Sequence, residues 1–111
     1  MYRVIEKDWK LFRKLLPGWQ EAYMERLVEE YKELLNSEML ASEKFWELDK
    51  RIKKHKQHTG VLAKYVKRSN MLQHITNLIY EEAITKDDLA DFSEDLRDAV
   101  NTWLRVDGGN I

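Results

Sequence analysis

Residues 89–103, LADFSEDLRDAVNTW, carry the most regular hydrophobic pattern of the chain. Apolar side chains recur there mostly at steps of three and four residues, at Leu89, Phe92, Leu96, Ala99, Val100 and Trp103. This recurrence places them on one side of an α-helix, whereas a half-buried strand alternates every second residue. Thr85, followed three residues later by Asp88, approximates a capping box and predicts that this helix begins near Thr85.

Two helices are predicted in the first third of the chain. The first covers about residues 7–16 and ends at Pro17, because a residue that precedes a proline is pushed out of the α region. The second begins at Pro17, which suits a first helical turn, and runs to about Leu35 with glutamates on its polar faces. The sequence therefore predicts a break between two helices at Pro17.

Two more helices are predicted in the middle of the chain. Residues 36–41 read as a loop, and Ser42 is a good N-cap for a helix that ends in lysines before Gly60. Ser69 or Asn70 caps a helix that runs to about Ile79. Residues 61–68 allow two interpretations, a helical turn or a minor extended segment paired with residues 2–5.

These patterns together predict an all-α fold, a compact bundle of four to five helices, mostly antiparallel, with at most one minor extended segment. Residues 1–106 form one domain, and residues 107–111 form a C-terminal tail that frays. Hydrophobic residues make up 43% of the chain, enough for a core, and 4 glycines with 1 proline are too few for a turn-rich β fold.

The composition also excludes several classes of protein. Cysteine is absent, so disulfide frameworks, cysteine-based zinc sites and thiol catalysis are excluded. No apolar run approaches the roughly 20 residues of a membrane-spanning helix, and the first eight residues lack the apolar stretch of a secretory signal. We therefore expect a cytoplasmic protein without membrane contact.

Charge is segregated along the chain, although the net charge is only −1. Residues 50–80 hold eight basic residues and no acid, whereas residues 81–111 hold nine acids and three basic residues. One interpretation of the basic segment is an anion or nucleic-acid surface, on which an aromatic ring stacks against a base. The other is a solvated helix end that complements its own dipole. The candidate residues are Lys50, Arg51, Lys53, Lys54, Lys56, Lys64, Tyr65, Lys67 and Arg68.

The acidic segment predicts a second surface. Asp87, Asp91, Glu94 and Asp98 follow one another at helical steps, so we expect them to share one face of the last helix. That face is either ordinary solvated surface or a docking face for a basic protein. The candidate docking residues are Asp87, Asp91, Glu94, Asp95 and Asp98.

No catalytic, cofactor or metal site stands out. His55 and His58 have a spacing that suits a metal, but their neighbours are lysines, so a chance pair on a solvated helix end is favoured. A DNA-binding helix-turn-helix over residues 72–100 is rejected, because its second helix would place acidic side chains against the DNA phosphates, which repel them. We therefore expect no enzyme, no cofactor and no metal. Of the tryptophans, Trp19 and Trp103 are predicted in the core, and Trp9 and Trp46 are left open between core and partner site.

Several short sequence segments resemble segments of known proteins. The chain resembles a group of short uncharacterised proteins of gut Firmicutes, some of which are labelled "multidrug transporter". The likeness covers most of the length and implies a bacterial protein, but no activity and no functional residues. The transporter label conflicts with a sequence that has no spanning segment. The phrases are Asp8-Trp9-Lys10-Leu11-Phe12, Trp19-Gln20-Glu21-Ala22-Tyr23-Met24, Phe45-Trp46-Glu47-Leu48, Ser69-Asn70-Met71 and Ile84-Thr85-Lys86-Asp87-Asp88-Leu89.

The leading functional hypothesis is a small non-enzymatic protein–protein interaction or accessory module, which binds an unknown protein or itself as a homodimer. One alternative is a nucleic-acid-associated protein that uses the basic segment 50–68. The other is an inhibitor that offers its acidic last helix to a basic protein.

Overall fold

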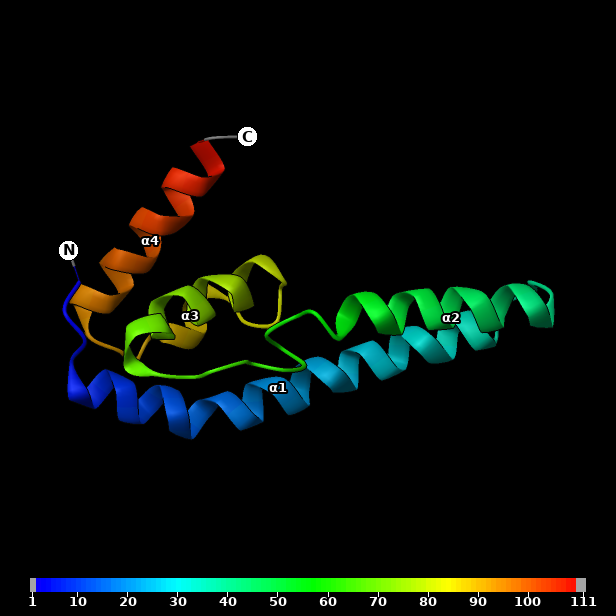
Figure 1. The fold of residues 1–111 in the computed structure, drawn as a ribbon, viewed down its shortest axis with the longest axis horizontal. Coiled ribbons are helices and arrows are strands. Elements are labelled where there is room, and N and C mark those ends of the chain that lie inside the picture. The colour runs from blue at the N-terminus through cyan, green and yellow to red at the C-terminus, as the bar shows by residue number, and fades with distance from the viewer. Residues whose placement is uncertain (1, 110–111) are drawn as a thin grey trace.

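The all-α prediction is confirmed. A computed structural model describes the backbone of residues 2–109 and the side chains of residues 2–106. Within that range the chain forms four α-helices and two short 3₁₀ helices, and no strand (Figure 1). The elements are α1 (Glu6–Leu35), α2 (Ala41–His55), η1 (Arg68–Asn70), α3 (Met71–Tyr80), η2 (Lys86–Leu89) and α4 (Glu94–Gly109).

The predicted break at Pro17 is wrong, because α1 continues through the proline for 30 residues. An interior proline costs about 3 kcal/mol. The exposed ring of Pro17 faces away from the core, while Phe12 and Leu16 before it and Tyr23 and Leu27 after it are buried. Packing on both sides of Pro17 therefore outweighs its local preference.

One hydrophobic core lies where the first half of α1 meets α3, η2 and α4. We call this part, residues 2–20 and 59–106, the body. Packing between α3 and α4 completes it, and partly buried side chains such as Trp19 and Leu104 cover its edges. The buried core residues are Trp9, Phe12, Leu16, Met71, Ile75, Leu78, Ile84, Leu89, Phe92, Leu96 and Val100.

The last helix begins later than predicted. Thr85 and Asp88 do form a capping box, in which the Thr85 N–H donates to Asp88 Oδ2 at 2.8 Å, but it closes only the short η2. The chain then turns, and the Ser93 hydroxyl accepts a hydrogen bond from the Leu96 N–H at 3.1 Å. Ser93 is therefore the N-cap of α4. The bounds of α4 include residues 107–109 of the predicted tail. The side chains of 107–111 and the backbone of 110–111 lie outside the described residues.

A buried carboxylate ties the start of α4 to the start of α1. Asp8 is 1% exposed. Its oxygens accept hydrogen bonds from the Ser93 N–H at 2.9 Å, the Ser93 hydroxyl at 2.6 Å and the Tyr2 hydroxyl at 2.8 Å. Burial and the neighbouring Asp8 raise the pKa of Tyr2 to about 12. Asp8 therefore fixes three groups that lie up to 85 residues away along the chain.

Of the two interpretations of residues 61–68, the extended pairing with residues 2–5 is wrong. Residues 61–67 form an irregular loop, and Arg68 begins η1. Tyr65 has a positive φ of 54°, and the Asn70 amide donates to its carbonyl at 2.6 Å. The Asn70 side-chain oxygen accepts from the Lys67 N–H at 2.9 Å. Asn70 is the N-cap of α3, as predicted, but its side chain bonds to the loop and not to the helix.

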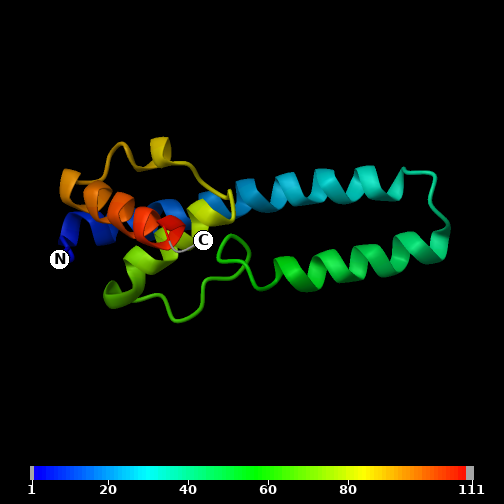
Figure 2. The ribbon, with the colours of Figure 1, turned by 90° about the horizontal axis from the view of Figure 1, so that it is seen from above.

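The second half of α1 and all of α2 form an antiparallel hairpin that projects from the body (Figures 1 and 2). We call this hairpin, residues 21–58, the arm. α2 begins at Ala41 without a side-chain cap, so the predicted cap at Ser42 is wrong, whereas its last turn is basic as predicted. The radius of gyration is 16.5 Å, against roughly 13 Å for a rounded domain of this length.

A short joint connects the arm to the body. The Glu81 carboxylate accepts hydrogen bonds from the Thr59 N–H at 2.8 Å and the Gly60 N–H at 2.9 Å, and the Gln20 amide donates to the Thr59 carbonyl at 2.9 Å. Gly60 is buried against the Tyr23 ring, where a Cβ would collide with the ring carbons. The joint requires glycine because the backbone approaches the ring so closely.

Candidate functional site

The two helices of the arm meet along a seam of buried and half-buried side chains. Leu27 and Leu34 are buried on α1, while α2 has no buried residue among its 15. A narrow seam of this kind covers only one side of each helix. The remaining sides are open to solvent or to a partner, and their chemistry decides what the arm can bind.

Two tyrosine–histidine pairs hold the seam together. The Tyr31 hydroxyl is hydrogen-bonded to His55 Nδ1 at 2.5 Å and the Tyr23 hydroxyl to His58 Nδ1 at 2.7 Å, and the two imidazole rings lie 5.5 Å apart. Burial raises the pKa of Tyr31 and lowers the pKa of His55. The prediction of a chance pair on a solvated helix end is therefore wrong for these histidines, because both rings are half-buried against α1.

Sequence reasoning missed these pairs, although a signal was present. Tyr23 and Tyr31 are eight residues apart on one helix, and His55 and His58 have the three-residue spacing of one helix side, although in the structure His58 lies in the turn after α2. What the sequence did not show is that the two sides face each other. Within the residues that carry described side chains, no three histidine, aspartate or glutamate side chains gather as metal ligands would.

One flank of the arm is charged. Arg51 of α2 lies 3.6 Å from the Glu30 carboxylate of α1 and 3.1 Å from the Glu47 carboxylate of its own helix. This ion-pair group crosses the seam and marks the side of the hairpin that we call the charged flank. It also places Arg51, one of the predicted anion-binding residues, in contacts within the chain.

The opposite flank is apolar. Val28 and Leu35 are two helical turns apart on α1. They lie on the side of this helix that is opposite Glu30 with respect to the seam, and both are about half exposed. Phe45 of α2 likewise lies on the side of its helix opposite Arg51, because the two residues are six positions apart. Its side chain is 64% exposed.

At the tip of the arm this surface widens. Trp46 is 66% exposed, and its ring packs edge-on against Phe45 with the ring centroids 5.1 Å apart. Leu40 and Met39 of the connecting turn are exposed beside it. The open prediction for Trp46 is thus resolved in favour of an exposed aromatic. We call the following set the apolar flank: Met24, Val28, Leu35, Phe45 and Trp46.

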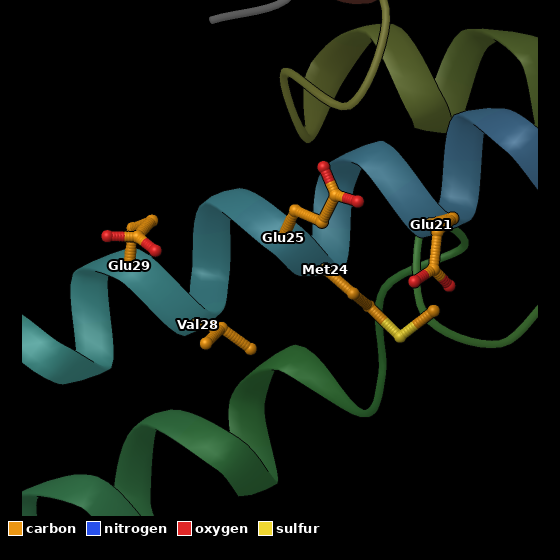
Figure 3. A pocket seen from close by; sticks show the side chains of 5 residues that line it. All are labelled: Glu21, Met24, Glu25, Val28 and Glu29. Carbon is orange, nitrogen blue, oxygen red and sulfur yellow. The ribbon is translucent and has the colours of Figure 1, made fainter.

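A shallow hollow of about 350 Å³ lies on the α1 part of this flank (Figure 3). Figure 3 shows Met24 and Val28 directed toward α2, with Glu25 and Glu29 on the other side of the ribbon. Glu21 completes the rim. The hollow therefore offers an apolar floor and an acidic border, the combination that a partner with apolar and basic side chains would match.

The structure divides the predicted basic surface into two groups. Lys50, Lys53, Lys54 and Lys56 lie on the outside of the arm, with Lys53 paired to Asp49 at 2.9 Å. The other members, Lys64, Tyr65, Lys67 and Arg68, lie on the loop that crosses the body toward the start of α1 (Figures 1 and 2).

Arg68 of the second group is engaged within the chain. Its guanidinium contacts both Glu6 oxygens, at 2.8 and 3.1 Å, and lies 5.4 Å from the Trp9 ring. The hydrogen bond from Arg68 lowers the pKa of Glu6 and raises that of Arg68. Tyr65 is almost fully exposed. The basic residues of 50–68 thus do not form one continuous patch.

The predicted acidic face is interrupted. Asp87 belongs to η2 and Asp91 to the turn after it, while Glu94, Asp95 and Asp98 are exposed on the first turns of α4. The prediction that these acids share one helix face is wrong, because α4 begins only at Glu94. Asp95 and Asp98 instead border a hollow of about 900 Å³ between α4 and the N-terminal segment.

Trp103 lines this larger hollow with Leu72 and Val4, and it is 41% exposed. The prediction that Trp103 belongs to the core is therefore wrong, because the N-terminal segment and α3 border this side of α4 without closing over the Trp103 ring within the described residues. Trp19 is partly buried between Phe12 and Phe92, with ring centroids 6.3 and 6.2 Å away. That contact supports its predicted core position.

Compared with protein-family models, with curated proteins and with solved structures, the chain matches none of them. The likeness to short bacterial proteins thus stays a prediction. In residues 2–109 no helix combines the length and the apolar character of a membrane span.

Proposed function

We propose that this chain is a non-enzymatic protein–protein interaction module, and that the apolar flank of the arm is its docking surface. One observation carries the proposal. Phe45 and Trp46 are about two-thirds exposed on a helix that buries none of its residues. Singly scattered apolar side chains are normal on a protein surface, but a contiguous group of them marks a site of association.

The residue types support the same function. Aromatic side chains and methionine are enriched at interfaces, where a few large rings supply most of the binding energy. Charged side chains, among them Glu21, Glu25 and Lys53, surround the apolar flank. An apolar centre within a polar rim is the usual anatomy of a docking surface.

The proposal is tested with a photo-crosslinking residue. Benzoylphenylalanine is placed at Val28 or at Trp46 on the apolar flank and, as a matched control, at the exposed Glu33 on the other side of α1. After irradiation in the native host, we expect a discrete protein adduct from positions 28 and 46 and none from position 33. The absence of any adduct from both flank positions would contradict the proposal.

A further inference from the structure

We infer that the partner of the apolar flank is a second copy of this chain, with the two arms packed face to face about a two-fold axis parallel to the arm. In this arrangement α1 of one copy lies on α2 of the other. The inference rests on the proposed docking function and identifies the molecule that docks on the apolar flank. It follows from charge, from the position of the apolar side chains and from the size of the surface.

The two helices of the arm carry opposite charge. Residues 21–35 of α1 hold five acids and two basic residues, which gives −3. Residues 41–56, which are α2 with its C-cap, hold six basic residues and three acids, which gives +3. Both sums count every side of the helix, and without the Glu30–Arg51 pair of the charged flank they are −2 and +2. A surface built from one acidic and one basic helix is complementary to itself when a two-fold axis exchanges the helices. Placing α1 on α1 of the partner would oppose like charges.

The charges also match along the length of the arm. The hollow around Met24 is bordered by Glu21 and Glu25, at the end of the arm next to the body. Lys56, the C-cap of α2, lies at the same end, next to Lys53, which is already paired with Asp49. An axis parallel to the arm keeps these ends level, so the lysines of one copy lie over the glutamates of the other. Lys56 has no ion pair among the described side chains, which leaves its ammonium group available.

The apolar side chains match in the same arrangement. Leu35 and Phe45 are both at the tip of the arm, one on each helix. When the helices are exchanged, Phe45 of each copy covers Leu35 of the other. Each aromatic ring then leaves water against an aliphatic side chain, and a ring of this size buries about 150 Å² or more. The interface has two identical copies of this contact.

The surface is large enough for a weak dimer. A 15-residue helix is about 22 Å long, and two helices side by side are about 20 Å wide. Two such faces together hide about 900 Å², close to the lower limit of roughly 1,000 Å² for a specific interface. We therefore expect a dimer that forms and dissociates in the micromolar range.

Sedimentation equilibrium of the purified full-length chain tests the inference. The mass should rise with concentration from 13.4 kDa toward twice that value. Phe45→Glu should raise the dissociation constant about tenfold or more, while helix content in circular dichroism stays unchanged because this side chain is largely exposed in one copy. A dimer that Phe45→Glu leaves unaffected would overturn the inference.

Charge reversal tests the arrangement of the helices. Glu25→Lys alone and Lys56→Glu alone should each weaken the dimer, because each opposes like charges across the interface. An equimolar mixture of the two variants should restore the association, because every contact between unlike copies is then complementary. The matched control is Lys54→Glu, which makes the same charge change on the charged flank and should have little effect. Two variants that do not rescue each other would contradict the placement of α1 on α2.

The crosslinking experiment separates failure of this inference from failure of the proposed function. An adduct of two copies of the chain supports both. An adduct with a different protein, combined with a strictly monomeric purified chain, overturns the dimer and keeps the docking surface. The absence of adducts overturns both.

Discussion

The body and the arm are built from the same long helix, yet they differ in what they bury. In the body, α1 contributes Trp9, Phe12 and Leu16 to a core that α3, η2 and α4 close from the other sides. Beyond the joint, where Tyr23 meets Gly60 and Arg26 donates to the Glu82 carbonyl, the arm part of the same helix packs against α2, which buries no residue. The body thus closes its core within a single chain, whereas the arm leaves an apolar flank uncovered. This contrast is why we propose the arm as the binding region and assign stability to the body.

The largest expected effect compares a phenylalanine from each region. Phe12→Ala empties a fully buried site in the body and should lower the free energy of unfolding by about 4 kcal/mol. Phe45→Ala removes a largely exposed ring from the arm and should change the stability of the single chain by less than about 0.5 kcal/mol. Urea unfolding at low protein concentration measures both. Equal losses would show that body and arm do not differ as described.

The next effect concerns carboxylates. Asp8→Ala leaves the Ser93 N–H and the Tyr2 hydroxyl without their acceptor in the buried part of the body and should cost about 3 kcal/mol. Asp49→Ala in the arm breaks only a partly exposed pair with Lys53 and should cost less than about 1 kcal/mol. The same unfolding measurement applies. A small loss for Asp8→Ala would mean that water satisfies these donors and that the start of α4 is not held from α1.

The sequence predicted the helices of both regions because the recurrence of apolar residues is a local property. It did not predict which stripes are covered. Trp103 lies in a pattern as regular as those of buried residues, and Trp46 stands beside a similar stripe, but their exposure depends on whether another element packs against them. The continuation through Pro17 depends on packing before and after it, and the burial of Asp8 depends on Ser93, 85 residues away. Properties of this kind depend on residues far apart in the chain, so they can be determined only from the folded structure.

A smaller effect tests the joint between the two regions. Gly60→Ala places a Cβ against the Tyr23 ring and should cost about 2 kcal/mol, because neither the ring nor the Glu81-bound backbone can move freely. Gly18→Ala is the matched control. Gly18 lies inside α1 with no atom within 4 Å of an added Cβ, so this change should stabilise the chain by up to about 1 kcal/mol. If Gly60→Ala were neutral, the joint would be looser than its hydrogen bonds indicate.

The smallest expected effect is a pH dependence to which each region contributes one histidine. Burial lowers the pKa of His74 in the body, opposed in part by the Lys64 backbone and then by Glu81. Burial also lowers the pKa of His55 in the arm, opposed in part by Glu30. An unfolded histidine takes up its proton near pH 6.5, whereas these two folded imidazoles stay neutral to lower pH. The unfolded chain therefore binds more protons below about pH 6.5, and stability should fall as the pH drops through that value.

Two substitutions assign this pH dependence to its regions. The ring nitrogens of the buried His74 make no close hydrogen bond and have the Lys64 backbone as a weak partner. His74→Met should therefore remove the body's share of the pH dependence and change the free energy of unfolding little at pH 7.5. His55→Asn places an amide oxygen near the position of Nδ1, so it keeps an acceptor for the Tyr31 hydroxyl and should remove the arm's share of the pH dependence. Urea unfolding at pH 7.5 and 5.5 measures both variants. Because His74 is the more deeply buried ring, its replacement should flatten the pH profile more, and the reverse order would place the stronger desolvation in the arm.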